Sequence, residues 1–305
     1  MTMNATPDKD VDLTTLPNTL ACQPWELLIP IEGSGINSGV SAVEFKGKLY
    51  AFYLKSNPGQ PTTIGYATLS KNIKNRLFVE SLDELTAKDV AHFRPAVTVY
   101  DDHLFCFFTA TDQTLRYHVF TGTDWSAVDT VPHTLTADAP SVATHGNRLY
   151  LVLRGTVGNV FYHNVFDNFS WGTNIPSYHI LFNDSPSLCM YEEKPHVAIN
   201  GLDGQLHVFV FTDNQWRPAL RLSQRNLYGA PALHAWAKFI VTATRSSVTH
   251  RFLTELIHPP AARPQLYKTA GPYVSPPCLT TYDHDLYLLG QRPCNDLGIS
   301  RFNPD

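Results

Sequence analysis

A degenerate internal repeat of about 46 residues limits the fold of this 305-residue chain more than any other feature of its sequence. At six places a small residue or Pro is followed two positions later by Val or Leu, and the first members of these motifs are 54, 45, 46, 45 and 46 residues apart. The motifs are Ser41-Ala42-Val43, Pro95-Ala96-Val97, Pro140-Ser141-Val142, Pro186-Ser187-Leu188, Pro231-Ala232-Leu233 and Pro277-Cys278-Leu279.

Two further apolar runs follow each motif. The second runs cover 48–54, 103–109, 148–154, 194–200, 238–244 and 285–291, and the third runs cover 63–69, 114–120, 159–166, 205–211, 247–253 and 297–303. The runs are rich in Val, Phe, Tyr and Leu and are bounded by Gly, Asn, Asp and Pro, which is typical of short antiparallel strands. The period predicts an all-β, six-bladed β-propeller with four antiparallel strands per blade. A β-sandwich and two small β-domains are the alternatives.

The N-terminal part of the chain is expected to close the ring. Trp125, Trp171 and Trp216 follow the third runs of their repeats, where a fourth, outer strand should begin, but the sixth repeat ends before such a strand. The segment that starts at Trp25 carries the same Trp and a following apolar run. We therefore predict one propeller domain over 21–305, closed by a strand near Trp25, after a flexible segment over 1–20.

Composition argues against several classes of partner and cofactor. The net charge is only -4 and the 23 Lys and Arg residues form no basic run, so we expect neither nucleic acid nor a membrane surface as a partner. No signal peptide or membrane span is recognisable, which favours a cytoplasmic protein. The five cysteines form no C-x-x-C pair and the 13 histidines stand singly. We therefore expect reduced thiols, no metal and no cofactor. A homodimer is left open.

The third repeat resembles a blade of the bacterial and fungal propeller lectins, which include the six-bladed fucose-specific lectins of fungi. The residues that carry this resemblance are Ala139-Pro140-Ser141, the run from Asn147 to Thr156, and the run from Phe166 to Trp171. The resemblance implies a glycan-binding function, in which an Arg on a second strand and a Glu on a third strand hold sugar hydroxyls between blades. The Arg positions here are Tyr50, Phe105, Tyr150, His196, Ile240 and Tyr287, and the Glu positions are Tyr66, Tyr117, Tyr162, Val208, His250 and Ser300. No repeat keeps the pair.

The repeats also differ from one another, which favours one asymmetric pocket over several equal sites. One repeat has Arg154 where another has Asn200, and the fifth repeat lacks the Trp. In length, degenerate blades and lost sugar ligands the chain is similar to the fungal hetero-Diels–Alderases of tropolone sesquiterpenoid pathways. This similarity implies a cofactor-independent enzyme that joins a quinone-methide intermediate to a terpene, with a small hydrophobic natural product as substrate. The alternatives are a glycan-binding lectin of altered specificity and a non-catalytic interaction propeller.

The candidate site residues come from the starts of the innermost strands and the loops before them, because these segments line propeller pockets. We assign Arg94 and His92 to polarising a substrate oxygen, with Tyr228 as a further donor. The candidate substrate-binding residues are Asn37, Ser38, Asp138, Asp184, Tyr273 and Ser275. Such residues also cap strand ends and turns, so a structural role stays open. One deep, partly apolar channel pocket would favour the enzyme, and shallow polar notches between blades would favour the lectin.

Overall fold

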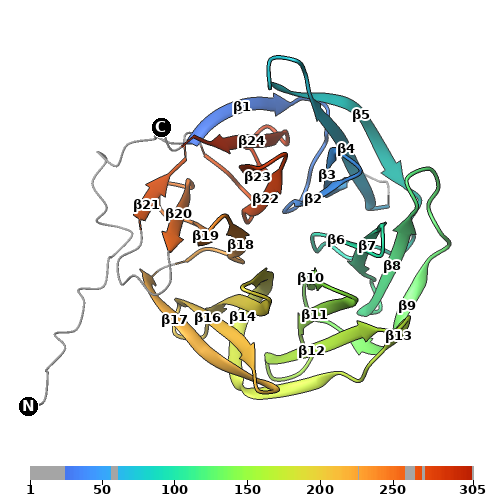
Figure 1. Ribbon diagram of the computed structural model, residues 1–305, viewed down its shortest axis with the longest axis vertical. Coiled ribbons are helices and arrows are strands. Elements are labelled where there is room, and N and C mark those ends of the chain that lie inside the picture. Colours follow the sequence, from blue (N-terminus) through green and yellow to red (C-terminus); the bar gives the residue numbers. More distant parts are fainter. Residues whose placement is uncertain (1–24, 56–60, 226, 258–264, 270–271, 304–305) are drawn as a thin grey trace, which may run out of the picture.

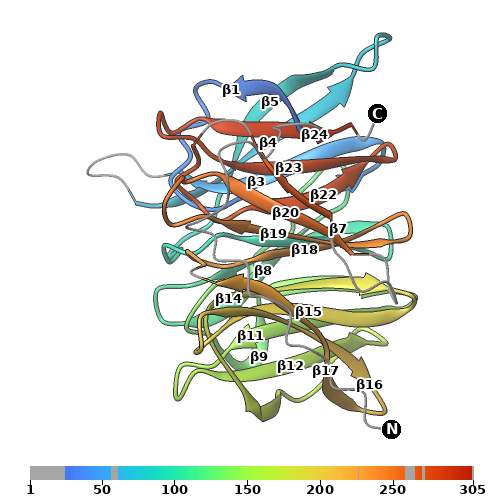
Figure 2. The same cartoon turned by 90° about the vertical axis from the view of Figure 1, so that its left-hand side faces the viewer.

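The computed structural model describes residues 25–55, 61–225, 227–257, 265–269 and 272–303. Within these ranges every regular element is a β-strand, and the strands form six antiparallel blades around a central axis (Figure 1). The strands run roughly along the short axis of the disc (Figure 2). The predicted all-β propeller is therefore confirmed, whereas the predicted flexible segment lies outside the described residues. No helix in the described ranges has the length and apolar character needed to cross a membrane.

Each blade is a meander that starts at the axis and ends at the rim. Blade 1 contains β2 (Ser41–Phe45), β3 (Lys48–Lys55), β4 (Thr63–Lys71) and β5 (Leu77–Leu85), and blade 2 contains β6 (Ala96–Tyr100), β7 (His103–Thr109), β8 (Thr114–Phe120) and β9 (Asp129–Leu135). Blade 3 contains β10 (Ser141–His145), β11 (Arg148–Arg154), β12 (Val160–Asp167), β13 (Ser170–Trp171) and the first part of β14 (Ile175–Tyr191). Blade 4 contains the rest of β14, β15 (Lys194–Gly201), β16 (Gln205–Thr212) and β17 (Gln215–Arg225). Blade 5 contains β18 (Ala232–Trp236), β19 (Phe239–Arg245), β20 (Phe252–Ile257) and β21 (Gln265–Lys268), and blade 6 contains β22 (Cys278–Tyr282), β23 (Asp285–Gln291), β24 (Leu297–Phe302) and β1 (Trp25–Ile31).

Strand β1 closes the ring as the outer strand of blade 6. It pairs antiparallel with β24, and Trp25 lies opposite Phe302 with the ring centroids 5.0 Å apart. Three other tryptophans repeat this arrangement, because each is bridged to the Phe near the end of its third strand. The pairs are Phe120–Trp125, Phe166–Trp171 and Phe211–Trp216. The predicted equivalence of Trp25 with these tryptophans is therefore confirmed.

The hydrophobic core is divided among the junctions between blades. The described residues form six apolar clusters, each drawn from two neighbouring blades. Trp25 belongs to the cluster between blades 5 and 6, where only 4% of its surface is exposed. Its indole Nε1 donates a hydrogen bond to Thr254 Oγ1 of blade 5 at 2.8 Å. Neighbouring blades thus support each other, and a missing strand weakens two junctions at once.

Two parts of the predicted register are wrong. Ser41 pairs with Phe52 as Ala96 pairs with Phe107, so the first motif should begin at Val40. Blade 1 lacks the Pro that marks this point in the other repeats, and the shift followed from that absence. In blade 5 the third strand starts at Phe252, later than predicted, because the chain first makes a hydrogen-bonded turn between Ser246 and His250.

A buried histidine at the junction of blades 3 and 4 predicts a pH-dependent stability. His163 packs against Phe211 and Trp216, and burial lowers its pKa to about 4. Between pH 6.5 and 4 the unfolded chain therefore binds a proton that the folded chain does not. We expect the free energy of unfolding to decrease as the pH is lowered from 6.5 to 4, by up to about 1.4 kcal/mol per pH unit from this residue. Above pH 6.5 this residue should cause no pH dependence.

Denaturant unfolding of the wild type and of His163→Phe at several pH values checks this expectation. The Phe ring keeps the aromatic packing but cannot titrate, so its profile should be flatter between pH 4 and 6.5. Equal slopes for the two proteins would show that His163 is not the cause.

Candidate functional site

Two pockets lie on the central axis, and Arg94 lines both. The first has a cavity volume of about 380 Å³ and opens toward the hairpins that join the two inner strands of each blade; we call it the hairpin-side pocket. The second has a volume of about 260 Å³ and is lined by the loops that enter the inner strands; we call it the loop-side pocket. The channel is therefore split into two chambers.

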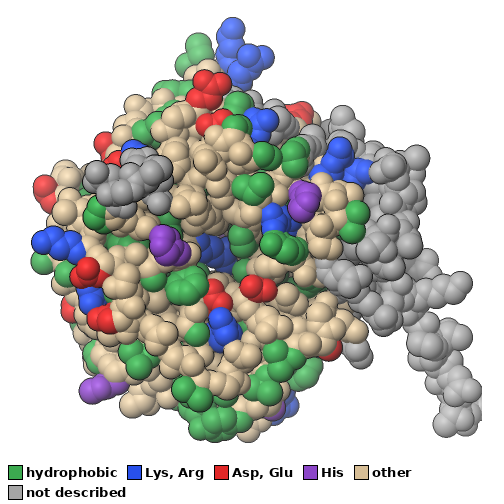
Figure 3. Space-filling view, turned by 180° about the vertical axis from the view of Figure 1, so that it is seen from behind, with side chains coloured by type: hydrophobic (Ala, Val, Ile, Leu, Met, Phe, Trp, Pro, Cys, Tyr) green, Lys and Arg blue, Asp and Glu red, His purple; other side chains and the backbone are tan. Residues whose placement is uncertain are grey.

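The loop-side pocket gathers seven of the nine predicted site residues. They are Asn37, Ser38, His92, Arg94, Asp138, Asp184 and Ser275. One face of the molecule is hollowed near its centre, with basic, acidic and histidine side chains close together there (Figure 3). The strand-entry rule that selected these residues from the sequence thus predicts that they lie at the axis, where seven of them line one cavity.

Arg94 crosses the channel from blade 2. Its Nη1 donates to the Pro277 carbonyl of blade 6 at 3.2 Å, and its Nη2 donates to the Pro186 carbonyl of blade 4 at 3.5 Å. Gly39 makes room for the aliphatic part of the side chain, since a Cβ at that position would lie 3.2 Å from Arg94 Cδ. The side chain forms a partition between the two pockets.

Asp138 is held by a buried ion pair. Its Oδ2 accepts hydrogen bonds from Arg154 Nη2 at 2.7 Å and Nε at 3.2 Å, and its Oδ1 accepts one from Ser185 Oγ at 2.9 Å. The side chains of the pair are only 19% and 14% exposed. Both partners are thereby fixed, so Asp138 presents an oriented and largely neutralised carboxylate to the pocket.

Asp184 reaches the pocket from a bend inside β14. This strand forms the outer edge of blade 3 and then the inner strand of blade 4, and its register shifts between Asn183 and Ser187. Asp184 has a left-handed φ of 60° at this bend. Burial raises the pKa of its carboxyl, and the charge of Asp138 adds to the effect, while a hydrogen bond from Asn200 at 3.3 Å opposes it. Asp184 is therefore less fully neutralised by protein groups than Asp138.

Two of the predicted residues have structural roles as well. Ser38 Oγ accepts a hydrogen bond from the Leu54 amide at 3.0 Å, and Ser275 Oγ accepts one from the Gln291 amide at 2.9 Å. These bonds tie each entry loop to the end of the second strand of its own blade. The two serines illustrate the strand-capping alternative that the sequence left open.

Tyr228 and Tyr273 do not line either pocket, which corrects their predicted positions. Tyr273 is 1% exposed and stacks on Phe252 with the ring centroids 4.0 Å apart. Tyr228 is 55% exposed, and the Arg245 guanidinium lies 4.1 Å from its ring centroid. Arg245 Nη1 also donates to the Tyr273 carbonyl at 3.1 Å. Both tyrosines therefore pack around blades 5 and 6, and no tyrosine is found among the described residues that line the two pockets.

Several lining residues were missed from the sequence. Phe93 and Ser185 stand beside predicted residues and could have been included by the same rule. Gln291 could not, because it ends a second strand and reaches the pocket from there; its Nε2 donates to the Ile36 carbonyl at 3.0 Å. The comparison of repeats singled out Arg154 by its position, but it did not predict the ion pair of Arg154 with Asp138. The apolar part of the pocket wall includes Ala230, Val274 and Pro276.

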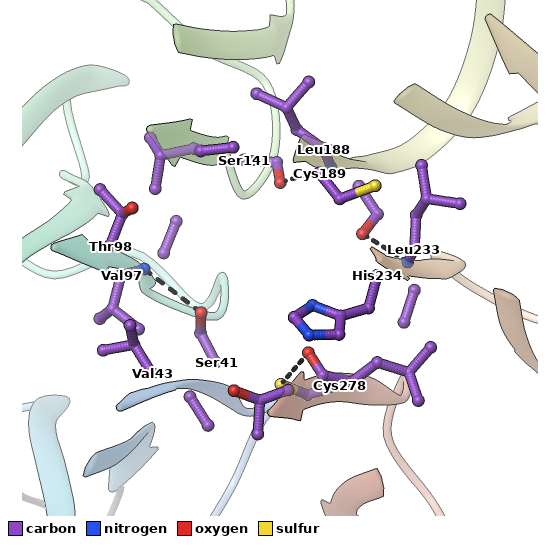
Figure 4. Close-up of a pocket in the computed structure, with 18 of the residues that line it drawn as sticks. Ser41, Val43, Val97, Thr98, Ser141, Leu188, Cys189, Leu233, His234 and Cys278 are labelled. Atoms are coloured by element: carbon purple, nitrogen blue, oxygen red, sulfur yellow. Dashed lines mark hydrogen bonds between the residues drawn. The ribbon is translucent and has the colours of Figure 1, made fainter. Parts of the chain in front are cut away.

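The hairpin-side pocket is bounded by a belt of serine hydroxyls that join neighbouring blades. Ser41 Oγ accepts from the Val97 amide, Ser141 Oγ from the Leu188 amide and Ser187 Oγ from the Leu233 amide, at 2.9–3.2 Å. The His234 ring points into this chamber, and its Nε2 lies 2.7 Å from Thr281 Oγ1 (Figure 4). Burial lowers the pKa of His234 to about 4. This chamber is thus lined mainly by short neutral side chains.

The positions at which the fucose lectins hold sugar between blades are filled by packed side chains. Phe105, Tyr117, His196 and Tyr287 are at most 8% exposed. Tyr66 packs against Trp125 of the next blade with the ring centroids 5.9 Å apart. Four of the assigned positions are also wrong in register. The residues that match Tyr117 are His163 in blade 3 and Ile299 in blade 6, and not Tyr162 and Ser300. The residue of blade 5 that matches Tyr50 is Val241 and not Ile240, and His250 lies in a turn before β20.

Nothing in the described part of the chain gathers three His, Cys, Asp or Glu side chains in a way that could hold a metal ion. Cys189 and Cys278 line the hairpin-side pocket, and burial raises the pKa of both thiols, that of Cys278 to about 11. They are therefore protonated and unreactive near neutral pH.

No family model and no curated protein matches this sequence. Solved structures do match. The six-bladed fucose-recognising lectin of Aleuria aurantia aligns with a TM-score of 0.64 at 10% identity, over 85% of this chain and 89% of the lectin. AofleA from Arthrobotrys oligospora aligns with a TM-score of 0.66 at 12% identity, over 90% of this chain and 85% of that protein. A Trypanosoma rangeli sialidase aligns with a TM-score of 0.62 at 11% identity, over 88% of this chain and 55% of the enzyme. At such identities the likeness shows a shared propeller fold.

Proposed function

We propose that this chain binds one small, oxygen-rich molecule in the loop-side pocket and acts as a glycan-binding propeller with a single axial site. The observation that carries the proposal is the convergence of Arg94, His92, Asp138 and Asp184 on one cavity. Sugar hydroxyls need donors and acceptors close together, because each hydroxyl both donates and accepts. Fold likeness to fucose-recognising lectins supports the ligand class.

The pocket also offers a surface for the carbon skeleton of a sugar. Phe93 is partly buried at its wall, and Val274 and Pro276 line it from the loop that enters blade 6. The volume of about 260 Å³ is just below the range of about 300–1,000 Å³ that is typical of drug-sized ligands. A ligand the size of one or two sugar rings suits this site better than a long oligosaccharide.

A glycan array followed by titration calorimetry tests the proposal. We expect saturable binding of one sugar per chain. Asp184→Asn should weaken it roughly tenfold or more, because a carboxylate accepts stronger hydrogen bonds than an amide. Tyr66→Phe is the matched control, since it removes a hydroxyl at an inter-blade position away from the axis. Absence of binding to any glycan on the array would reject the proposal. Binding of several sugars per chain with affinities that Asp184→Asn does not change would reject the axial site.

A second candidate function is favoured by the axial position of the pocket and by the partly buried guanidinium of Arg94. We propose as this alternative a hetero-Diels–Alder cycloaddition of a tropolone-type quinone methide with a terpene. One C–C and one C–O bond form while π bonds are consumed, and no group leaves and no electron is exchanged. Arg94 would stabilise charge that develops on the quinone-methide oxygen, and the walls would hold the partners together.

Incubating a quinone-methide precursor with a sesquiterpene, with and without the protein, tests this alternative. Catalysis should change the ratio of stereoisomeric adducts from that of the uncatalysed reaction. An unchanged ratio and an unchanged rate would exclude it. Asp184→Asn serves as a control that should affect sugar binding more than cycloaddition.

A further inference from the structure

Arg94 carries a positive charge that the described residues leave unpaired. Its guanidinium donates hydrogen bonds to two backbone carbonyls, those of Pro277 and Pro186. Among the described residues no carboxylate forms an ion pair with it, and Asp138, whose charge acts on it, is already paired with Arg154. A guanidinium has five N–H donors, so up to three remain for a ligand.

Partial burial makes this arrangement costly for the protein alone. Transfer of a charge from water is unfavourable unless an opposite charge or several hydrogen bonds replace the lost solvation. Desolvation lowers the pKa of Arg94 from its ordinary value, yet an arginine stays protonated at neutral pH. The partition between the two chambers is therefore a fixed, partly buried cation.

We propose that the ligand of the loop-side pocket carries a carboxylate, which pairs with the Arg94 guanidinium. This inference rests on the proposed function, because it takes the loop-side pocket as the sugar site, and it narrows the ligand to an acidic sugar such as a uronic acid. A carboxylate is planar and can accept two parallel hydrogen bonds from a guanidinium edge. A doubly charged group would fit less well, because Asp184 lines the same cavity.

The asymmetry of the blades supports the choice of Arg94 as the specificity-determining residue. Arg94 stands two positions before the first paired residue of its inner strand, and the residues at the equivalent position of the other blades are Gly39, Ala139, Ser185, Ala230 and Pro276. None of them carries a charge, so the channel has one cation at this level and not a ring of six. A single carboxylate can be matched by a single guanidinium without leaving other charges unpaired.

Titration calorimetry with matched sugars tests the inference. Glucuronate and galacturonate are compared with their neutral amides, which have the same shape but no charge. On the wild type we expect at least one acid to bind ten times or more tighter than its amide. Arg94→Met should bring that ratio close to one, and Arg94→Lys should restore part of it, because the charge returns without the fork geometry.

The dependence of affinity on ionic strength provides a second test, which uses the wild-type protein and so does not require that a variant folds. Raising the salt concentration should weaken binding of the acid much more than binding of the amide. Equal affinities of acid and amide, or tight binding of neutral sugars only, would overturn the inference and leave the proposed function standing. If neither charged nor neutral sugars bind, both fail. Equal losses for acid and amide in Arg94→Met would show that the side chain only braces the blades.

Discussion

Removal of residues 25–31 should abolish cooperative folding of the whole ring. These residues form β1, whose loss exposes the outer edge of β24 and takes Trp25 from the cluster between blades 5 and 6. An exposed edge strand is a template for pairing with other chains. We expect the truncated protein to elute as aggregate in size-exclusion chromatography and to lack a sharp thermal transition in circular dichroism.

A point variant separates the effect of the core from that of the strand. Trp25→Ala should lower the free energy of unfolding by about 3–5 kcal/mol, the usual cost of truncating a buried Trp. Glu26→Gln is the matched control on the same strand, because Glu26 is exposed and its carboxylate accepts hydrogen bonds from Arg301 and Asn303. Its expected cost is about 0–1 kcal/mol. A monomeric truncation that melts cooperatively near the wild-type temperature would contradict closure by β1.

The second large effect is expected at the ion pair between Asp138 and Arg154. Asp138→Ala leaves the Arg154 guanidinium with one side-chain partner, Asn159 Oδ1 at 2.7 Å, and Arg154→Met leaves the carboxylate unpaired beside the pocket. Breaking a buried pair costs about 3–5 kcal/mol. Because both side chains keep some exposure, we expect about 2–4 kcal/mol for either variant, and weaker ligand binding as the pocket loses its shape.

Chemical denaturation of both single variants and of the double variant measures this coupling. The double variant should lose less stability than the two single losses added together, since neither charge is then left without its partner. Arg148 and Asp167 form a matched control pair in the same blade, at 2.8 Å but with Arg148 59% exposed. Arg148→Met should cost less than about 1 kcal/mol. Additive losses at Asp138 and Arg154 would show that the pair does not act as a unit.

The sequence predicted the propeller well because each repeat has a period-two apolar pattern and turn residues in the same order. Errors occurred where a marker was missing or a turn was longer. Val40 stands where the other blades have Pro, and this shifted the first motif by one residue. The extended turn between Ser246 and His250 moved the third strand of blade 5. Local patterns define strands, but insertions between them are decided by packing.

The candidate site was predictable where a rule of topology applies. Loops that enter inner strands must reach the axis, so Arg94, Asp138 and Asp184 were placed correctly. Tyr273 follows the same rule in sequence, yet its ring stacks on Phe252 in the junction of blades 5 and 6. Burial of a large aromatic side chain favours the junction over the wet channel, and one sequence cannot show which neighbour will receive it.

The pairing of β1 with β24 also has a consequence for how the protein is made. Glu26 and Arg301, which contact each other across the closure, are 275 positions apart in the chain. At a synthesis rate of about 5–20 residues per second, β1 waits roughly 15 to 55 seconds on the ribosome before its partner strand is translated. During that time its unpaired edge can meet other nascent chains on the same messenger RNA. The ring can close only after β24 has been synthesised, so the spacing of ribosomes and the holding of β1 by chaperones should influence the yield of folded protein.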